Sequence, residues 1–274
     1  MRKFKDNFFR ILIFINCAVF IIILYFLFAN LIRESGSISL DFIFGSPEGL
    51  PPGREGGIYP AIMGSLLSFF ISSFISSFLA ILSAIYIVFY LKNSKIKSSI
   101  RLIIQMISGI PSIVLGLFGY TMFVYRLAIG RSLLSASLTL AIMIFPFIEI
   151  RVEKLFLNFS KDIFEMALSL GLDRYFVIKK IILKALQNKI IQTITLGGSL
   201  AFGATAPIML TGAVIYTGVP KSLLKPYMSL PYHLYILINE GISSSMGYKT
   251  AVVLMILLFI INISAMLIGG RSDD

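Results

Sequence analysis

The chain has 274 residues, of which 57% are hydrophobic and 14% are charged, and its mean hydropathy is +0.92. Soluble proteins carry about 25% charged residues, so this composition excludes an ordinary soluble domain and indicates an integral membrane protein. The formal net charge is +11, but the basic residues stand in short clusters between apolar runs, which is typical of membrane topology signals rather than of nucleic-acid binding.

Six uncharged runs follow one another along the chain, and each is long enough for a transmembrane helix, which needs about 20 apolar residues. Two of them are longer than one span requires and are expected to continue into a loop or to lie tilted. The runs predict an all-α membrane protein with six transmembrane helices in a single domain, residues 11–274, with its core at about 59–270. The six runs are Ile11–Ile32, Tyr59–Leu91, Leu102–Tyr125, Ser132–Ile148, Ile190–Pro220 and Thr250–Gly270.

The orientation follows from the positive charges. Residues 1–10 are basic and precede an apolar run that is longer than the 7–15 residues of a signal-peptide core, so we expect an uncleaved first span with the N-terminus in the cytoplasm. With six spans the C-terminus is also cytoplasmic, and 17 of the 24 Lys and Arg residues then face the cytoplasm and 7 the exterior. This bias agrees with the positive-inside rule.

The connections between the runs differ in character. The external segment Arg33–Ile58 is rich in Gly, Pro and acid, and little regular structure is expected there. Lys92–Arg101 reads as a short basic cytoplasmic turn. The fifth span is expected to leave the membrane near Ala213, and the external connection Val214–Gly247 contains an apolar part, Leu234–Asn239, that could dip back into the membrane.

Glycine and proline interrupt the third and fifth runs. The third holds Gly109-Ile110-Pro111 and Gly116-Leu117-Phe118-Gly119, and the fifth holds Gly197-Gly198, Gly203 and Pro207. Proline removes a helical hydrogen bond, and small residues allow helices to approach closely. Two interpretations stay open: ordinary packing of a bundle, and broken helices at a transport pathway.

A charged segment, Glu149–Lys189, separates the fourth and fifth runs and falls in the cytoplasm. Ser160 is a predicted N-cap of a helix whose apolar face is Ile163, Phe164, Ala167 and Leu168, and Gly171 is its predicted stop. Asp173 then caps a second helix through Val177, Ile178, Ile181 and Ile182. This pattern predicts a helix–turn–helix elbow at about residues 158–184. It could lie on lipid headgroups or dock a partner, and the residues alone favour neither.

The elbow resembles the EAA loop of ABC importer permeases, whose pattern is E-A-A, three residues, Gly, nine residues, then I-x-L-P. This chain has Glu165-Met166-Ala167, Gly171 and Ile181-Ile182-Leu183-Lys184, so Met166 and Lys184 depart from it. The resemblance implies that the elbow fits a groove on a cytoplasmic ATPase. The residues that we assign to this coupling are Glu165, Ala167, Gly171, Asp173 and Arg174.

Further segments resemble phosphate ABC permeases of the PstA type. Ser108–Gly119 is similar to A-G-V-P-S-I-V-x-G-L-F-G, and Gly203–Gly212 to G-E-T-A-P-L-L-L-T-G; Gly56–Ile62 and Leu230–Tyr235 also fit. Together they cover nearly the whole chain in the family's order. Ala204 stands where the family has Glu. The family's Arg, four residues after the proline matched by Pro146, falls at Ile150, and Arg151 is next to it.

The resemblance implies an ABC importer permease fold in the bacterial inner membrane and an alternating-access pathway for phosphate. The implied partners are a second permease of the C type, two ATP-binding subunits and an extracytoplasmic phosphate-binding protein. No cofactor or metal is expected, since ATP would bind to the partner ATPases. The residues that we assign to the pathway are Gly109, Pro111, Ser112, Gly116, Gly203, Thr205, Pro207 and Arg151.

Other functional classes remain as alternatives. The chain has no G-x-x-x-x-G-K-[ST] motif, no convincing hydrolytic triad and no metal-ligand cluster, so we expect a transport subunit rather than an enzyme. It could import another oxyanion. An ion-coupled transporter or channel would need ionisable residues within its spans, and the six runs hold none. A membrane scaffold without transport is the third possibility. The lone His233 is expected at an external surface or interface.

Overall fold

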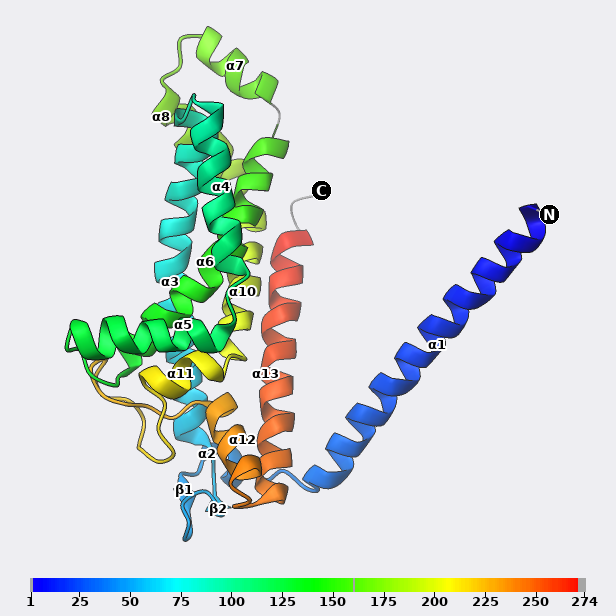
Figure 1. Cartoon of the computed structure of the whole chain (residues 1–274), viewed down its shortest axis with the longest axis vertical. Coiled ribbons are helices and arrows are strands. Elements are labelled where there is room, and N and C mark those ends of the chain that lie inside the picture. The colour runs from blue at the N-terminus through cyan, green and yellow to red at the C-terminus, as the bar shows by residue number, and fades with distance from the viewer. Residues whose placement is uncertain (1, 160, 271–274) are drawn as a thin grey trace.

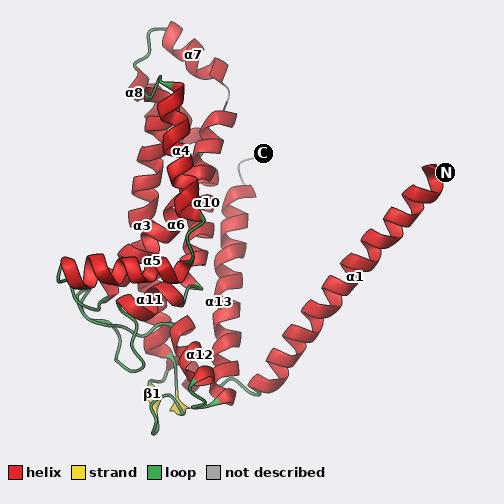
Figure 2. Cartoon of the chain, viewed as in Figure 1, coloured by secondary structure: helices red, strands yellow, loops and turns green. Residues whose placement is uncertain are grey.

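The computed structural model describes residues 2–159 and 161–270, and nearly all of its regular structure is helical (Figures 1 and 2). The long helices run along the long axis of the molecule, except α1, which leans away from them (Figure 1). One end carries α7 (Lys161–Ser169) and is called the elbow end. The other carries the short antiparallel pair β1 (Pro47–Glu48) and β2 (Glu55–Gly56) and is called the hairpin end.

Four helices form the central bundle. α3 (Tyr59–Ile85) continues into a π-helical turn, η1 (Tyr86–Tyr90), and packs along α6 (Leu133–Asn158). α10 (Gln187–Phe202) packs against both of these and against α13 (Ser244–Gly270). The helices can approach closely because small residues occupy the contact faces. On α3 the buried small residues include Gly64, Ser65, Ser68, Ser72, Ser76 and Ala80.

α1 (Arg2–Ser35) is a helix with little packing of its own. Its main contact is with α13, and from Phe9 onward its apolar side chains are largely exposed. Such a surface suits lipid or the helix of another subunit rather than water.

The third predicted span is two helices. α4 (Ser94–Ser108) ends at Gly109, and α5 (Ser112–Gly119), continued by the π-helical η2 (Tyr120–Arg126), leaves at 97° to it. Pro111 has no N–H to continue the hydrogen-bond ladder, which is the physical reason for the break. Of the two interpretations left open for this run, the structure has the broken helix, while its place at a transport pathway stays a prediction. The basic segment predicted as a turn mostly forms the first two turns of α4.

The fifth predicted span is also broken. α10 ends at Phe202, and the short helix α11 (Ala206–Thr211) follows. The chain beyond α11 is largely irregular until α12 (Leu230–Asn239), which packs on α13. The expected end of the fifth span near Ala213 agrees with the end of α11.

Within the described residues, four helices are long and apolar enough to cross a membrane, and counting the bent α4–α5 pair as one span gives up to five. The six predicted spans are thus not six straight helices, because α10 has only 16 residues. The fourth also differs from its prediction: α6 runs ten residues past Ile148, so the first part of the charged segment belongs to this helix.

The hairpin end contains the expected irregular loop, with a short helix, α2 (Leu40–Phe44), and the β1–β2 pair as its regular parts. His233, expected at an external surface or interface, is instead buried on α12, with 5% of its surface exposed. Gly53 lies over the imidazole, so close that an added Cβ would be 3.0 Å from Cε1.

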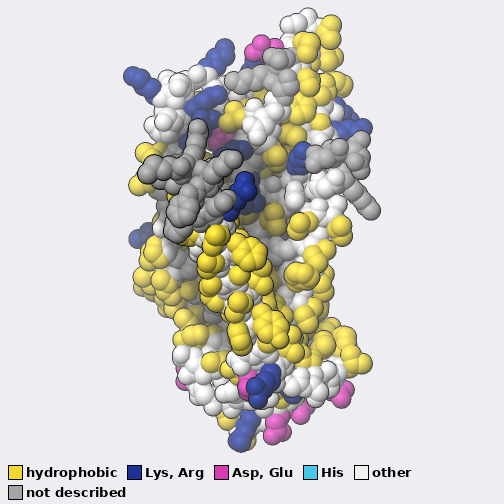
Figure 3. Space-filling view, turned by 90° about the vertical axis from the view of Figure 1, so that its right-hand side faces the viewer, with side chains coloured by type: hydrophobic (Ala, Val, Ile, Leu, Met, Phe, Trp, Pro, Cys, Tyr) yellow, Lys and Arg dark blue, Asp and Glu magenta, His cyan; other side chains and the backbone are white. Residues whose placement is uncertain are grey.

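The surface divides along the long axis. On the face shown in Figure 3, hydrophobic side chains form a belt around the middle, Lys and Arg gather toward the elbow end, and charges of both signs occupy the hairpin end. An apolar belt between two polar ends is what a bilayer requires of a spanning protein.

Candidate coupling elbow and pathway segment

The first arm of the elbow ends in a Schellman motif. Gly171 has a φ of +81°, and its N–H donates to the Leu168 carbonyl at 3.0 Å. The Leu172 N–H donates to the Ala167 carbonyl at 3.2 Å, the bond that defines the motif. Because a left-handed conformation costs an L side chain about 1–2 kcal/mol, this position favours glycine. The predicted stop at Gly171 is confirmed.

Asp173 begins the second arm. Its Oδ2 accepts hydrogen bonds from the Tyr175 N–H at 2.9 Å and the Phe176 N–H at 3.4 Å, so the predicted N-cap is confirmed. The other predicted cap, Ser160, lies outside the described residues. The second arm consists of α8 (Arg174–Phe176), the π-helical η3 (Val177–Ile182) and α9 (Leu183–Ala185).

The underside of the elbow packs on the bundle. Phe164, Ala167 and Leu168 of α7 lie against the main hydrophobic core, whereas Ile163, predicted on the same face, is exposed. The Phe89 ring of η1 joins the two parts, with its centroid 5.0 Å from that of Phe164 and 5.5 Å from that of Phe156 on α6. In the second arm, Val177, Ile178 and Ile182 are buried, and Ile181 is partly buried against the same core.

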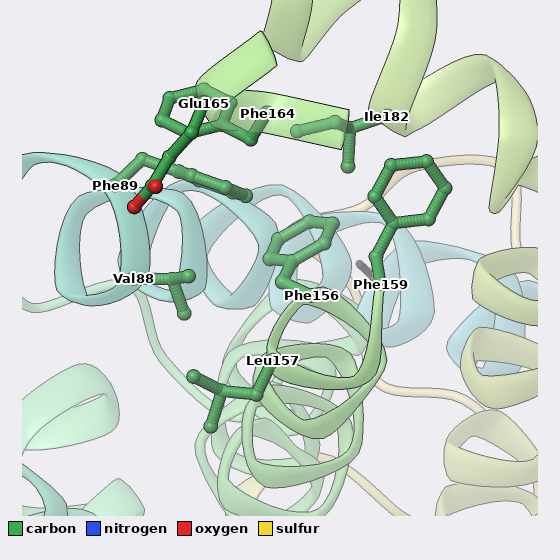
Figure 4. A pocket seen from close by; sticks show the side chains of 8 residues that line it. All are labelled: Val88, Phe89, Phe156, Leu157, Phe159, Phe164, Glu165 and Ile182. Atoms are coloured by element: carbon green, nitrogen blue, oxygen red, sulfur yellow. The ribbon is translucent and has the colours of Figure 1, made fainter. Parts of the chain in front are cut away.

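A cavity of about 210 Å³ lies between the elbow and the bundle (Figure 4). Glu165 lies beside Phe164, with its carboxylate pointing toward the helix that carries Val88 and Phe89. Apart from Glu165, the residues that line the cavity are apolar. The lining is Val88, Phe89, Phe156, Leu157, Phe159, Phe164, Glu165 and Ile182.

Arg174 ties the elbow to η1. Its Nη1 donates to the Phe89 carbonyl at 3.2 Å, and its guanidinium carbon lies 5.7 Å from the centroid of the Tyr90 ring. The carbonyls near a helix end have no partner within the helix, so this bond satisfies one of them. Arg174 therefore contacts its own chain, while its role in ATPase coupling stays a prediction.

The outer face of the elbow is apolar and exposed. Met166 is 58% exposed, Leu170 is 82% exposed and Tyr175 is 61% exposed. A cluster of large exposed apolar side chains at the tip of a molecule is typical of an interaction surface. The elbow thus has a fixed underside and a free outer face.

The two broken segments meet in the structure. α5 packs on α11, and a Cβ on Gly116 would lie 2.9 Å from the Pro207 Cα and 3.0 Å from the Ala206 carbonyl oxygen. This is contact between two backbones, which only glycine permits. The structure therefore brings Gly116 and Pro207 together, although 90 residues separate them.

The other pathway residues lie at the ends of these helices. Gly109, Pro111 and Ser112 are exposed at the α4–α5 break, and Gly203 and Thr205 lie at the α10–α11 break. Both breaks leave backbone N–H groups without helical partners. The structure places these residues at interruptions of the helices, and their role in transport stays a prediction.

Arg151 lies apart from this group. It is exposed on α6, with its guanidinium carbon 4.0 Å from the centroid of the Phe147 ring. α5 contacts α6 at Thr139, which a Cβ on Gly119 would touch. Arg151 follows Thr139 by twelve residues on the same helix, which corresponds to about 18 Å along its axis. The structure does not bring Arg151 to the α5–α11 contact.

Charged residues that the sequence analysis did not single out meet between α4 and α6. Arg101 pairs with Glu153, and Glu149 is buried one turn earlier on α6. The four-residue spacing of Glu149 and Glu153 indicates from the sequence alone that the two acids share one helix face. The partner of Glu153 could not be predicted from the sequence, because Arg101 is 52 residues away.

Comparison with known proteins identifies the family. The family model described as "Binding-protein-dependent transport system inner membrane component" matches residues 76–273. The chain belongs to this family. Its membership agrees with the apolar helices, and together they establish a multi-pass membrane protein of the all-α permease fold.

Curated relatives in this family match part of their own length. "Probable ABC transporter permease protein YqgI" of Bacillus subtilis is 25% identical over 65% of this chain and 65% of the relative. "Phosphate transport system permease protein PstA 2" of Mycobacterium tuberculosis is 30% identical over 65% of this chain and 60% of the relative. "Probable phosphate transport system permease protein PstA" of Methanocaldococcus jannaschii is 28% identical over 62% of this chain and 60% of the relative. The matches thus span less than two thirds of these relatives.

Solved structures share the fold. A bacterial ABC transporter involved in alginate import matches with a TM-score of 0.69 over 99% of each chain, at 14% identity. The MetNI methionine ABC transporter matches with a TM-score of 0.60 over 77% of this chain and 94% of that chain, at 17% identity. At these identities the likeness establishes the fold and leaves the substrate open.

Proposed function

We propose that this chain is the permease subunit of an ATP-driven importer of inorganic phosphate. The observation that carries the proposal is the elbow, which Gly171 and Asp173 shape and which presents an exposed apolar face at one end of the bundle. Relatives named as phosphate transport permeases, at 28–30% identity, support phosphate as the substrate.

In this proposal the elbow faces the cytoplasm and docks one of two ATP-binding subunits. Both chain termini are then cytoplasmic as well. Motion of the ATPase would pass through the packed underside, where Phe164 and Arg174 hold η1 and three apolar residues of η3 are buried in the core. The elbow would therefore move α3 and α6 with it, since a packed interface transmits displacement.

The pathway would lie along the contact of α5 and α11, shared with a second permease of the C type. An extracytoplasmic binding protein would deliver phosphate to the hairpin end. Backbone N–H groups at a helix start are donors for an anion, and the exposed start of α5 at Ser112 would supply such donors. The family's acid is Ala204 here, so binding cannot depend on a carboxylate at this position.

Co-purification with the ATPase tests the coupling part of the proposal. Glu165→Lys reverses a charge on the elbow, and Gly171→Asp forces a left-handed aspartate into its turn. We expect both variants to keep their place in the membrane but to lose most of the bound ATPase. Retention of ATPase by both variants, at the level of the unaltered chain, would contradict docking through the elbow.

Transport in proteoliposomes tests the substrate. With the second permease, the ATPase and the binding protein present, we expect uptake of labelled phosphate to require ATP and to resist excess sulfate. The same fold occurs in transporters titled for alginate and methionine, so another oxyanion is the alternative. Uptake of sulfate instead of phosphate would favour that alternative. Uptake driven by an ion gradient without ATP would indicate a secondary transporter.

A further inference from the structure

Arg101 on α4 is bound to one of two buried glutamates on α6. Its Nε donates to Glu153 Oε1 at 2.6 Å, and its Nη2 contacts the same oxygen. The Glu153 side chain is 7% exposed and the Arg101 side chain is 38% exposed, so the carboxylate is largely removed from solvent while the arginine remains partly exposed. This ion pair joins α4 to α6 through Arg101.

Glu149 is the second glutamate. The residue is 1% exposed, and neither carboxylate oxygen has a hydrogen-bond partner among the described residues. It precedes Glu153 by four positions, which places the two carboxylates on one face of α6, about 5–6 Å apart along the helix.

A cavity of about 200 Å³ connects Arg101, Glu149 and Glu153. Arg101, Gln105, Glu149 and Glu153 line it, together with Ile150, Lys154 and Leu157. This volume is large enough for several water molecules and leaves the guanidinium room to move. An ionised carboxylate without a partner is costly inside a protein, so a single arginine beside two acids has a second favourable position one turn away.

We propose that Arg101 is a switching residue of the transport cycle: it binds Glu153 in the conformation described here and Glu149 in the alternate conformation. The inference rests on the proposed function as a permease, because it assigns the two arrangements to inward and outward states. Both arrangements form one Arg–Glu pair, so the helices can exchange them without leaving the arginine unpaired. Two discrete pairings a helical turn apart also favour two positions of α4 over intermediate ones.

The place of Arg101 in the fold links the switch to the pathway. α4 runs from Arg101 to the Gly109–Pro111 break, and α5 beyond it packs on α11. A shift of α4 along α6 therefore moves the start of α5. α6 in turn contacts η1, which the elbow holds through Phe89. The switch thus lies between the elbow and the candidate pathway.

Spin-label distances on the full chain in nanodiscs test the switch without any partner. The labels go on Ser99→Cys of α4 and Asn158→Cys of α6, both exposed, in a Cys17→Ser background that removes the single native cysteine. Glu153→Gln leaves Arg101 only Glu149, and Glu149→Gln leaves it only Glu153. Lys154→Gln is the matched control, because it neutralises a charge that lines the same cavity outside the Arg–Glu switch.

We expect Glu153→Gln to shift the distance distribution by up to one helical turn, about 5 Å, and to change the ratio of the two populations at least about tenfold. Glu149→Gln and Lys154→Gln should keep the distribution of the unaltered chain. The switch is overturned if Glu153→Gln also keeps the distribution of the unaltered chain. It is overturned as well if Glu153→Gln and Glu149→Gln shift the distribution in the same direction. A merely structural ion pair predicts instead that Glu153→Gln broadens the distribution without a discrete second population, and that this effect is the same when Glu149→Gln is added.

The assembled transporter then separates the two proposals. Trapping with ATP and vanadate should populate the distribution seen for Glu153→Gln, and Glu149→Gln should prevent this and lower phosphate uptake about tenfold. If the isolated chain responds as expected but ATP never populates the second distribution, the switch stands and the proposed role in ATP-driven transport fails. If ATP drives uptake that Glu149→Gln leaves unchanged, the switch is not part of transport.

Discussion

A glycine in the left-handed conformation shapes the elbow on which the proposed coupling depends. Gly171 has a φ of +81° and Gly130 one of +77°, and a Cβ added to either would meet nothing within 4 Å. Substitution by alanine at either position therefore costs only backbone strain, about 1–2 kcal/mol. The two sites differ only in location, since Gly171 shapes the elbow and Gly130 lies in the turn after η2.

This similarity makes a controlled prediction. Gly171→Ala should raise amide hydrogen exchange across residues 163–182 and lower ATPase-coupled uptake several-fold, because the Schellman turn loses its favoured conformation. Gly130→Ala should leave both measurements near those of the unaltered chain. Equal losses in both variants would show that general destabilisation, rather than the elbow, limits transport.

His233 predicts a pH dependence at the residue scale. Burial lowers its pKa from 6.5 to about 4, so the unfolded chain binds a proton that the folded chain does not bind between these values. The stability contributed by neutral His233 is present above pH 6.5 and is lost as the pH falls toward 4, up to about 3 kcal/mol. It is the only histidine of the chain.

The measurement is the melting temperature of the purified protein at pH 7.5 and at pH 4.5. His233→Gln has no group that titrates here, so its melting temperature should fall less between the two values than that of the unaltered chain. An equal fall in the two proteins would assign the acid sensitivity to carboxyl groups instead.

At the scale of elements, the contact of α5 with α11 depends on the absence of a side chain. Gly116→Ala places a Cβ 2.9 Å from the Pro207 Cα, closer than packed atoms allow. Over-packing of this kind costs about 1–3 kcal/mol, so we expect a lower melting temperature and reduced uptake. Gly109→Ala is the control at the α4–α5 break, because its nearest neighbour is 3.5 Å away. A matching loss in both variants would make the break itself, not the α5–α11 contact, the sensitive feature.

Elements that depend on local chemistry could be predicted from the sequence. The stop at Gly171 and the cap at Asp173 follow from backbone conformation and short-range hydrogen bonds, which a few residues determine. The helix formed by α3 and η1 runs from Tyr59 to Tyr90, and the uncharged run Tyr59–Leu91 predicts these bounds to within one residue. Resemblance, rather than this local chemistry, supplied the ATPase as the elbow's partner.

Other elements depend on tertiary structure and could not be predicted. Hydropathy identifies an uncharged run at Leu102–Tyr125, and Gly109 and Pro111 mark a candidate break in it, but neither signal gives the direction of the chain after the break or the 97° angle. It also ended the fourth span at Ile148, although α6 continues to Asn158, where Glu153 pairs with Arg101 and where Arg151 and Lys154 are exposed. The Arg101–Glu153 pair and the Gly116–Pro207 contact join segments far apart in sequence, where periodicity carries no information.

At the scale of the whole molecule, the charges give the protein a direction in the membrane. The proposed topology places 17 of the 24 Lys and Arg residues on the cytoplasmic side, and the Lys and Arg side chains gather toward the elbow end of the face in Figure 3. The elbow can meet a cytoplasmic ATPase only if this direction is correct. The orientation is therefore the condition for every other part of the proposed mechanism.

Cysteine accessibility tests this orientation in intact cells. In a Cys17→Ser background, Ser169→Cys introduces one thiol at the elbow end and Ser222→Cys one at the hairpin side of the molecule, and both positions are exposed. A membrane-impermeant maleimide should label Ser222→Cys in intact cells and Ser169→Cys only after permeabilisation, because positive charge keeps the elbow side inside. Each variant serves as the control for the other. Labelling of Ser169→Cys in intact cells would invert the topology and remove the elbow from any cytoplasmic partner.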